Sequence, residues 1–328
     1  MIADASLLVT LVRLVERLPE PPSPAKRGRG RPRTYPDRLF VKALVVMIVR
    51  HLHKVHELLT VLDQPTVAMG QVRALLVLPD GRFPARRTWE RRLAALPETL
   101  PAQIACLGRH LVALLQPWAT CGRAGAIDST VLRAKGGVWH KKDRAAGIVP
   151  HPSIDTEAHW TKAGWHGWVY GGKRHLVTTV AGVWLPLAAA LPPANAAANE
   201  IAPLLLAHLP AEVRFILGDQ HYHAPNVRAR CDQADRVLVA SRHGGDPHTG
   251  DGVAVRRVFH KLRSTAIENF NAQCKAIFDV HGPVPSRGLV ATQRFALGAV
   301  LVSQLLLGHR HEQGMDLRVG LKPSLKAA

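Results

Sequence analysis

The chain has 328 residues, of which 47% are hydrophobic, enough for one large domain or two smaller ones with a sizeable core. It carries 43 lysines and arginines against 24 aspartates and glutamates, a formal net charge of +19, so its field attracts polyanions and nucleic acid is the expected partner. The longest apolar run, Ala43 to Val49, is too short to span a bilayer, and we expect no transmembrane segment.

The N-terminus lacks the positive region and the long apolar stretch of a secretory signal, so we expect a cytoplasmic protein. Four scattered cysteines fit that compartment. They form no CxxC pair, which argues against a structural zinc site and a disulfide framework.

Residues 1–35 are expected to form a short amphipathic helix followed by a basic arm. Leucines and valines recur at helical spacing from 2 to 18, before a proline-rich break, and five of the eight residues from Lys26 to Arg33 are cationic. Within the arm, Arg29 and Arg31 stand in an Arg-Gly-Arg-Pro core that resembles an AT-hook, whose arginines lie in the narrow A·T minor groove. A tether that binds phosphates without sequence preference is the open alternative.

Residues 36–120 show a helical period throughout and are interpreted as an all-helical DNA-binding domain. The expected helices are 39–52, 55–62, 71–76, 88–96 and 102–115, with Thr88 as an N-cap. A helix-turn-helix is possible, but the pattern does not identify its recognition helix. The arginines between 82 and 92, Arg86 and Arg87 among them, are candidates for phosphate contacts, and a solvated basic face is the alternative.

After residue 120 the period changes to that of strands. The expected strands are 125–132, 168–180, 183–191, 213–219 and 236–241; the expected helices are 199–208, 225–234, 262–280 and 291–307. Strands followed by alternating helices and strands predict an α/β fold in which helices flank a mixed sheet. We assign this domain to 121–310 and a C-terminal tail to 311–328.

Three acids in this second region are candidates for a metal site. Asp128 sits inside an apolar strand, Asp219 ends another strand, and Glu268 lies on a later helix. An acid in an apolar strand is costly unless it is paired or bound to a metal. Three converging carboxylates need cations, and their hard oxygens suit two Mg²⁺ ions, with Mn²⁺ as a possible substitute. Such a pair of ions supports phosphoryl displacement.

These residues resemble those of the DDE transposases of bacterial insertion sequences, and the resemblance covers nearly the whole chain. The matching pieces are Ala126 to Thr130, Trp165 to His175, Pro193 to Asn195, Leu217 to Asp219, and Glu268 followed by Lys275. The resemblance implies a ribonuclease-H-like core, with Asp128, Asp219 and Glu268 as catalytic metal ligands.

In that family a tyrosine, arginine, glutamate and lysine signature surrounds the last acid. Arg263, Glu268 and Lys275 are the counterparts here, although four residues rather than three separate Arg263 from Glu268, and His260 is nearest the tyrosine position. Arg263, Lys275 and Lys173 are therefore interpreted as DNA contacts. For Lys275, a solvated helix position is the equal alternative.

Other polar and aromatic residues of this region do not indicate a specific function. The histidines between 140 and 175 match no compact metal motif and are expected in a loop over the sheet. Trp160, Trp165 and Trp168 are expected to pack, with stacking on DNA bases as the alternative. Tyr222 is expected to pack rather than to contact DNA.

The resulting hypothesis is an insertion-sequence transposase that cleaves the terminal inverted repeats and transfers them to target DNA, as a homodimer without a membrane partner. The alternative is a non-catalytic DNA-binding protein derived from a transposase.

Overall fold

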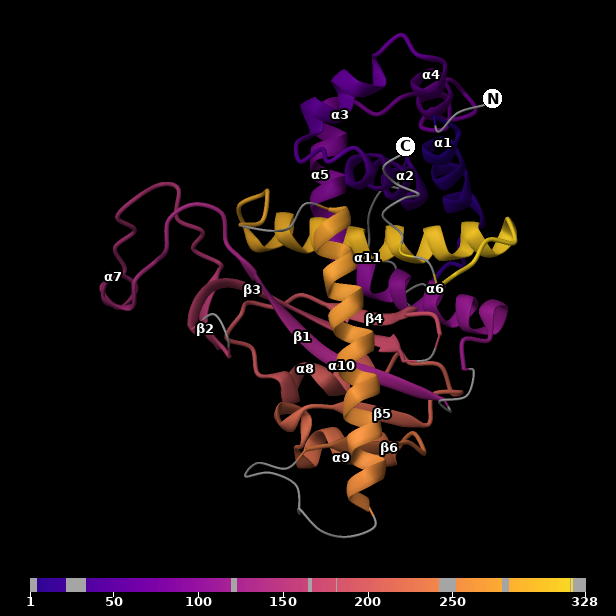
Figure 1. The fold of residues 1–328 in the computed structure, drawn as a ribbon. Helices are drawn as coiled ribbons and strands as arrows, with labels where there is room; N and C mark the ends of the chain where they lie inside the picture. The colour runs from indigo at the N-terminus through magenta and orange to yellow at the C-terminus, as the bar shows by residue number, and fades with distance from the viewer. Residues whose placement is uncertain are drawn as a thin grey trace.

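The structure is a computed structural model, and it describes residues 5–21, 34–118, 123–164, 167–180, 182–241, 252–278, 283–318 and 320. In Figure 1 the N-terminal helices form the upper part of the molecule and a twisted sheet forms the lower part. The fold expected from the sequence, a mixed sheet flanked by helices and preceded by a helical region, is confirmed.

The N-terminal region contains six helices within the described residues. They are α1 (Ala5–Leu14), α2 (Asp37–Val49), α3 (Val55–Leu62), α4 (Val67–Ala74), α5 (Arg86–Ala95) and α6 (Leu100–Leu115), with one-turn helices at Val15–Arg17 and Leu96–Glu98. The prediction that Thr88 caps its helix is wrong, because α5 begins one turn earlier, after Ala85. Within α5, the buried Trp89 packs on Phe40 and Phe83 and anchors the helix to the core.

The sheet has the strand order β2-β3-β1-β5-β6, and β4 pairs with β3. Its strands are β1 (Ala124–Arg133), β2 (His159–Ala163), β3 (Gly167–Thr179), β4 (Pro186–Ala190), β5 (Phe215–Gly218) and β6 (Val237–Ala240). The pairs of β3 with β1, β2 and β4 are antiparallel, whereas β5 runs parallel to β1 and β6. The sheet is therefore mixed.

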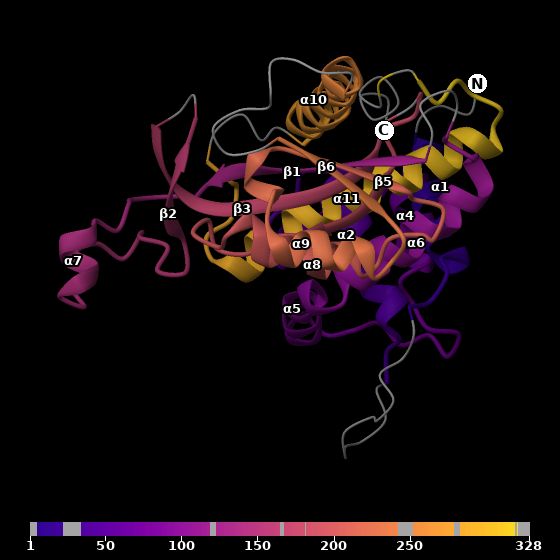
Figure 2. The same cartoon turned by 90° about the horizontal axis from the view of Figure 1, so that it is seen from below.

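Helices cover both faces of this sheet. Figure 2 shows α10 (Gly252–Ile277) on one face, and α8 (Ala198–Leu206) and α9 (Pro225–Asp232) on the other. The segment between β1 and β2 extends away from the body and contains the short helix α7 (Lys141–Ala145). The prediction of a histidine-bearing loop over the sheet is wrong for His159 and His175, which lie in β2 and β3.

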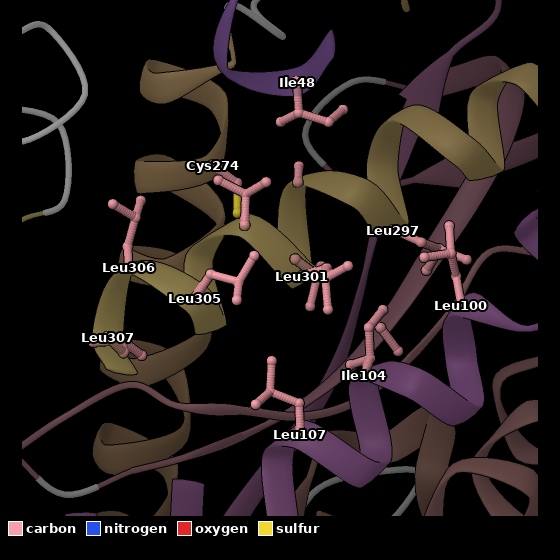
Figure 3. Close-up of a cluster of buried hydrophobic side chains, with 14 of the residues drawn as sticks. Ile48, Leu100, Ile104, Leu107, Cys274, Leu297, Leu301, Leu305, Leu306 and Leu307 are labelled. Carbon is pink, nitrogen blue, oxygen red and sulfur yellow. The ribbon is translucent and has the colours of Figure 1, made fainter. Parts of the chain in front are cut away.

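The last helix, α11 (Leu289–Glu312), joins the two parts of the molecule through one core. By length and composition α11 could cross a membrane, but 72% of its most apolar window is buried inside the protein. Figure 3 shows its leucines, such as Leu301 and Leu305, packed among Ile104 and Leu107 of α6, Ile48 of α2 and Cys274 of α10. Because residues from α1 through α11 share this core, α11 holds the helical region against the sheet.

The burial of α11 predicts a large difference between two leucine substitutions. Leu301 is completely buried, so Leu301→Ala should lower the free energy of unfolding by about 2–5 kcal/mol. Leu114 on α6 is 41% exposed, and Leu114→Ala should change it by about 0.5 kcal/mol or less. Urea denaturation of the two variants measures both values, and equal losses would contradict the central position of α11.

Candidate active site

The register of β1 against β5 brings Asp128 and Asp219 to the same level. The two strands are parallel, with Ala126 opposite Leu217, so the residues two positions further on, the two aspartates, lie side by side on one face. This is the face that α10 covers. The strand β5 ends at Gly218, so Asp219 is the first residue beyond its carboxyl end.

The backbone around Asp219 fixes the position of its carboxylate. Its Oδ1 accepts a hydrogen bond of 2.8 Å from the His221 amide, at the start of the one-turn helix η4 (Gln220–Tyr222). A Cβ at Gly218 would lie 2.9 Å from Cβ of Tyr222, so the close packing of Tyr222 on the strand end requires glycine there. Tyr222 is 1% exposed, which confirms the prediction that it packs.

Asp128 is neutralised by an arginine from α10. Nη1 of Arg263 donates to Oδ2 of Asp128 at 2.6 Å, and the two side chains are only 15% and 23% exposed. Oδ1 of Asp128 accepts from the Ser129 amide at 2.7 Å. Burial raises the pKa of Asp128, Arg263 opposes that effect, and the nearby Asp219 carboxylate raises the pKa further. The two acids are thus electrostatically coupled.

Glu268 lies apart from this pair. Glu268 is five positions after Arg263, which at ~3.6 residues per turn rotates it by about 140° from the side of α10 that reaches Asp128. It is exposed, whereas Ala266, Ile267 and Phe270 are buried against the sheet. Among the described residues, no three histidine, cysteine, aspartate or glutamate side chains gather closely enough to hold a metal ion.

The two predicted lysines are both half-buried. Lys173 is opposite Val131 in register, so it belongs to the face of the sheet opposite to that of Asp128. Burial lowers the pKa of Lys173, while Asp219 partly restores it, so Lys173 is close enough to Asp219 to act on it. Lys275 lines a small cavity together with Thr130 and Arg174. Arg174 is a buried cation that sequence reasoning missed, because nothing in the pattern of β3 distinguishes it from Lys173.

A buried polar chain underlies the acid pair and was also missed. The Tyr222 hydroxyl lies 3.4 Å from Nδ1 of His175, which is completely buried, and it also hydrogen-bonds Ser129. Burial raises the pKa of Tyr222 well above its ordinary value, and Asp128 and Asp219 add to the rise. Burial lowers the pKa of His175 to about 4, so the imidazole is neutral at physiological pH. The strand-like period of the sequence around His175 was the signal from which its burial could have been predicted.

The predicted DNA-binding arginines differ in their surroundings. Arg29 and Arg31 lie outside the described residues. Arg86 is paired with Glu90 on α5 at 2.9 Å, whereas Arg87 is exposed and forms no ion pair within the described part of the chain. Arg82 and Arg92 are also paired, with Asp80 and Asp37.

Two of the three tryptophans can be placed. Trp160 is half-buried against Tyr170, with ring centroids 5.4 Å apart. Trp168 is 59% exposed, and the ammonium group of Lys141 lies 4.8 Å from its ring centroid. Trp165 lies outside the described residues. Packing is therefore observed for Trp160 and not for Trp168.

Comparison with known proteins identifies the class. Residues 119–305 match the model of the transposase DDE domain, a span that includes both aspartates and α10. The chain therefore belongs to the transposase DDE family, and it is a transposase in this general sense.

Two other comparisons add little. No curated protein matches the chain significantly. A piggyBac transposase, solved by cryo-EM in a synaptic complex with hairpin DNA, aligns over 99% of this chain and 79% of its own, at 10% identity and a TM-score of 0.39. We draw no conclusion from so weak a likeness.

The low pKa of His175 predicts acid sensitivity. Between pH 6.5 and about 4, His175 binds a proton in the unfolded chain but not in the folded protein. The free energy of unfolding therefore falls as the pH is lowered through this range. The full difference between the two pKa values corresponds to roughly 3 kcal/mol in the free energy of unfolding. Urea unfolding at several pH values should show this slope, and His175→Gln should flatten it.

The exposed His151 supplies the matched control, because His151→Gln should leave the slope as it is in the parent protein. Parallel slopes for the parent and His175→Gln would show that His175 is not the responsible group.

Proposed function

We propose that this protein is an insertion-sequence transposase that cleaves DNA ends in a metal-dependent reaction and transfers them to target DNA. The observation that carries the proposal is the side-by-side placement of Asp128 and Asp219 on parallel strands, inside the region that matches the transposase DDE domain. The net charge of +19 supports DNA as the partner.

The aspartate pair fits a divalent cation. The two neighbouring carboxylates provide the hard oxygen donors that Mg²⁺ and Mn²⁺ prefer, and a cation between them would offset the effect by which Asp219 raises the pKa of Asp128. Asp128 and Asp219 would hold the metal. For Glu268 to complete a site for two ions, α10 would have to rotate on DNA binding and turn this exposed side chain toward the aspartates. When bound, Mg²⁺ would supply Lewis-acid stabilisation of the charge that develops on the phosphate oxygens.

The chain's own cations would position the DNA. Arg263 already lies beside Asp128, and its planar guanidinium can hold two oxygens of a phosphate brought to the acid pair. Lys173 lies on the Asp219 side and Lys275 near Thr130. Together these groups would bring positive charge from α10 and β3 to a phosphate at the acid pair.

The reaction would proceed in two displacements at phosphorus. In the first, water attacks the phosphate at the element's end, the P–O bond to the 3′ oxygen breaks, and a 3′-hydroxyl is released. In the second, that hydroxyl attacks a target phosphate and a target 3′ oxygen leaves. Both steps need DNA ends brought together, and we propose that a homodimer in the cytoplasm binds the two terminal inverted repeats.

The N-terminal helices would hold those repeats away from the acids. In Figure 2, α5 and α10 lie on opposite sides of the molecule. Arg87, exposed on α5 and without an ion pair among the described residues, is better placed for this than Arg86, whose charge Glu90 offsets. Arg29 and Arg31 of the basic arm would add contacts in the minor groove.

A second candidate function is DNA binding without catalysis. The observation that favours it is the exposure of Glu268, which α10 turns away from the aspartates. A protein derived from a transposase could keep its charge and fold in this way while lacking the third ligand.

Cleavage of DNA carrying the element's ends separates the two functions. With Mg²⁺ the parent protein should cut at the ends, and Asp128→Asn and Asp219→Asn should each reduce the rate at least about a hundredfold, because the lost stabilisation amounts to several kcal/mol. Gel analysis of end-labelled DNA measures the rate. Unchanged cleavage by Asp128→Asn would exclude the carboxylate mechanism, and no cleavage by the parent would favour DNA binding alone.

Two further variants sharpen this experiment. Asp235 is an exposed aspartate paired with Arg214, so Asp235→Asn makes the same chemical change away from the site and should leave the rate unchanged. Glu268→Gln tests the third ligand: we expect a loss like that of the aspartate variants, and a full rate would remove Glu268 from the site.

A further inference from the structure

Arg174 is a buried cation without a carboxylate partner. It lies on β3 opposite Thr130 of β1 and is 4% exposed. Its Nη2 donates to Oδ1 of Asn271 at 2.6 Å, but its Nε has no hydrogen-bond partner. In the part of the chain that the structure describes, no carboxylate lies within 4 Å of it.

This arrangement is costly for the free protein. The groups packed around the guanidinium are neutral, namely the amide of Asn271, the ring of Phe270 at 5.9 Å and the thiol of Cys274. A buried charge is expensive unless a counter-charge and hydrogen bonds compensate for it, and an apolar residue of similar size would often be more stable there. The missing counter-charge therefore points to an anionic ligand.

A small cavity beside Arg174 has room for part of such a ligand. Most of its wall is apolar, formed by Leu132, Cys274, Phe278, Phe295, Ala296 and Ala299. Its polar lining is Thr130, Arg174 and Lys275, so two cations share the same space. Its volume of about 10 Å³ is that of a single water-sized group. Thr130 and Lys275 are half-buried, so one oxygen of an anion can enter while the rest remains at the surface.

The cavity lies next to the acid pair. Thr130 follows Asp128 by two residues on β1, on the same face and about 6.6 Å along the strand. Arg174 is opposite Thr130 in register, and α10 covers both positions. An anion at this place would therefore be a close neighbour of a phosphate held at Asp128.

We propose that the cavity is a subsite for a DNA backbone phosphate adjacent to the bond that is cut, with Arg174 and Lys275 as its binding residues. One non-bridging oxygen occupies the cavity and accepts from the Nε of Arg174, while Lys275 contacts the phosphate from the solvent side. The ligand supplies the negative charge that Arg174 lacks in the free protein. This inference rests on the proposed function, because it assumes that DNA lies across the acid pair.

The test is a binding experiment that pairs a change in the protein with a change in one phosphate. Duplexes of the element's end are prepared with a single neutral methylphosphonate at successive positions around the cut, and their affinities are measured by fluorescence anisotropy without metal. For the parent protein one position should weaken binding about tenfold or more. For Arg174→Met the same substitution should have little further effect.

Arg228→Gln is the matched control. It removes an exposed arginine from α9, on the opposite face of the sheet, and should keep the parent's sensitivity at that position. Lys275→Gln should lose part of the parent's sensitivity to the methylphosphonate at that position. If Arg174→Met remains as sensitive as the parent protein at every position, the subsite is excluded.

Stability measurements separate ligand binding from a structural role. The urea midpoint of DNA-free Arg174→Met should equal or exceed that of the parent, because an uncompensated charge is removed. A lower midpoint together with an unchanged methylphosphonate profile would overturn the proposal. If Arg174→Met does not fold, Lys275→Gln decides, since full sensitivity in that variant excludes the subsite.

Failure of this inference is distinguishable from failure of the proposed function. Cleavage that depends on Asp128, combined with an unchanged profile in Arg174→Met, would reject the subsite alone. Absence of Mg²⁺-dependent cleavage by the parent would reject the transposition chemistry itself.

Discussion

The pairing of β1 with β5 is the constraint on which the candidate site depends. Because the strands are parallel and Ala126 is opposite Leu217, Asp128 and Asp219 must lie side by side. Two largely buried like charges raise each other's electrostatic cost, so positive charge has to be supplied from elsewhere in the fold. Arg263 supplies it from α10, and this ion pair connects the helix to the sheet at the acid pair.

The cations near the acid pair differ in whether a carboxylate compensates their charge. Asp219 raises the pKa of Lys173, Arg263 neutralises Asp128, and Arg174 has no carboxylate partner among the described residues. Part of the positive charge is therefore already neutralised, because several surface arginines, such as Arg86, are paired with acids. Arg87 and Arg174, by contrast, have no carboxylate partner among the described residues.

The helix α11 determines how rigidly these groups are held. It is buried between the N-terminal helices and the sheet, and the core runs from α1 through α11 without interruption. The division at residue 120 stays a prediction, because the helices before it and the sheet after it share this core. Because α11 packs against both, the N-terminal helices and the sheet belong to one closely packed interior.

Much of the fold followed from local pattern. The apolar residues around Asp128 in 125–132 and the apolar run before Asp219 predicted two strands, and the helical period predicted the N-terminal helices, because side-chain patterns reflect which face is buried. The pattern did not predict every boundary or strand: α5 begins at Arg86, before Thr88, and β2 is a short strand that pairs with β3.

The sequence by itself determined the chemical types present: aspartates in or at the ends of apolar strands, a helix with Arg263 and Glu268, and a surplus of positive charge. The tertiary structure alone decided which of them meet. Strand register placed Asp128 beside Asp219, whereas the rotation of α10 turned Arg263 inward and Glu268 outward. Sequence spacing gives the angle between two residues on a helix, but only packing against the sheet gives the direction in which that helix faces.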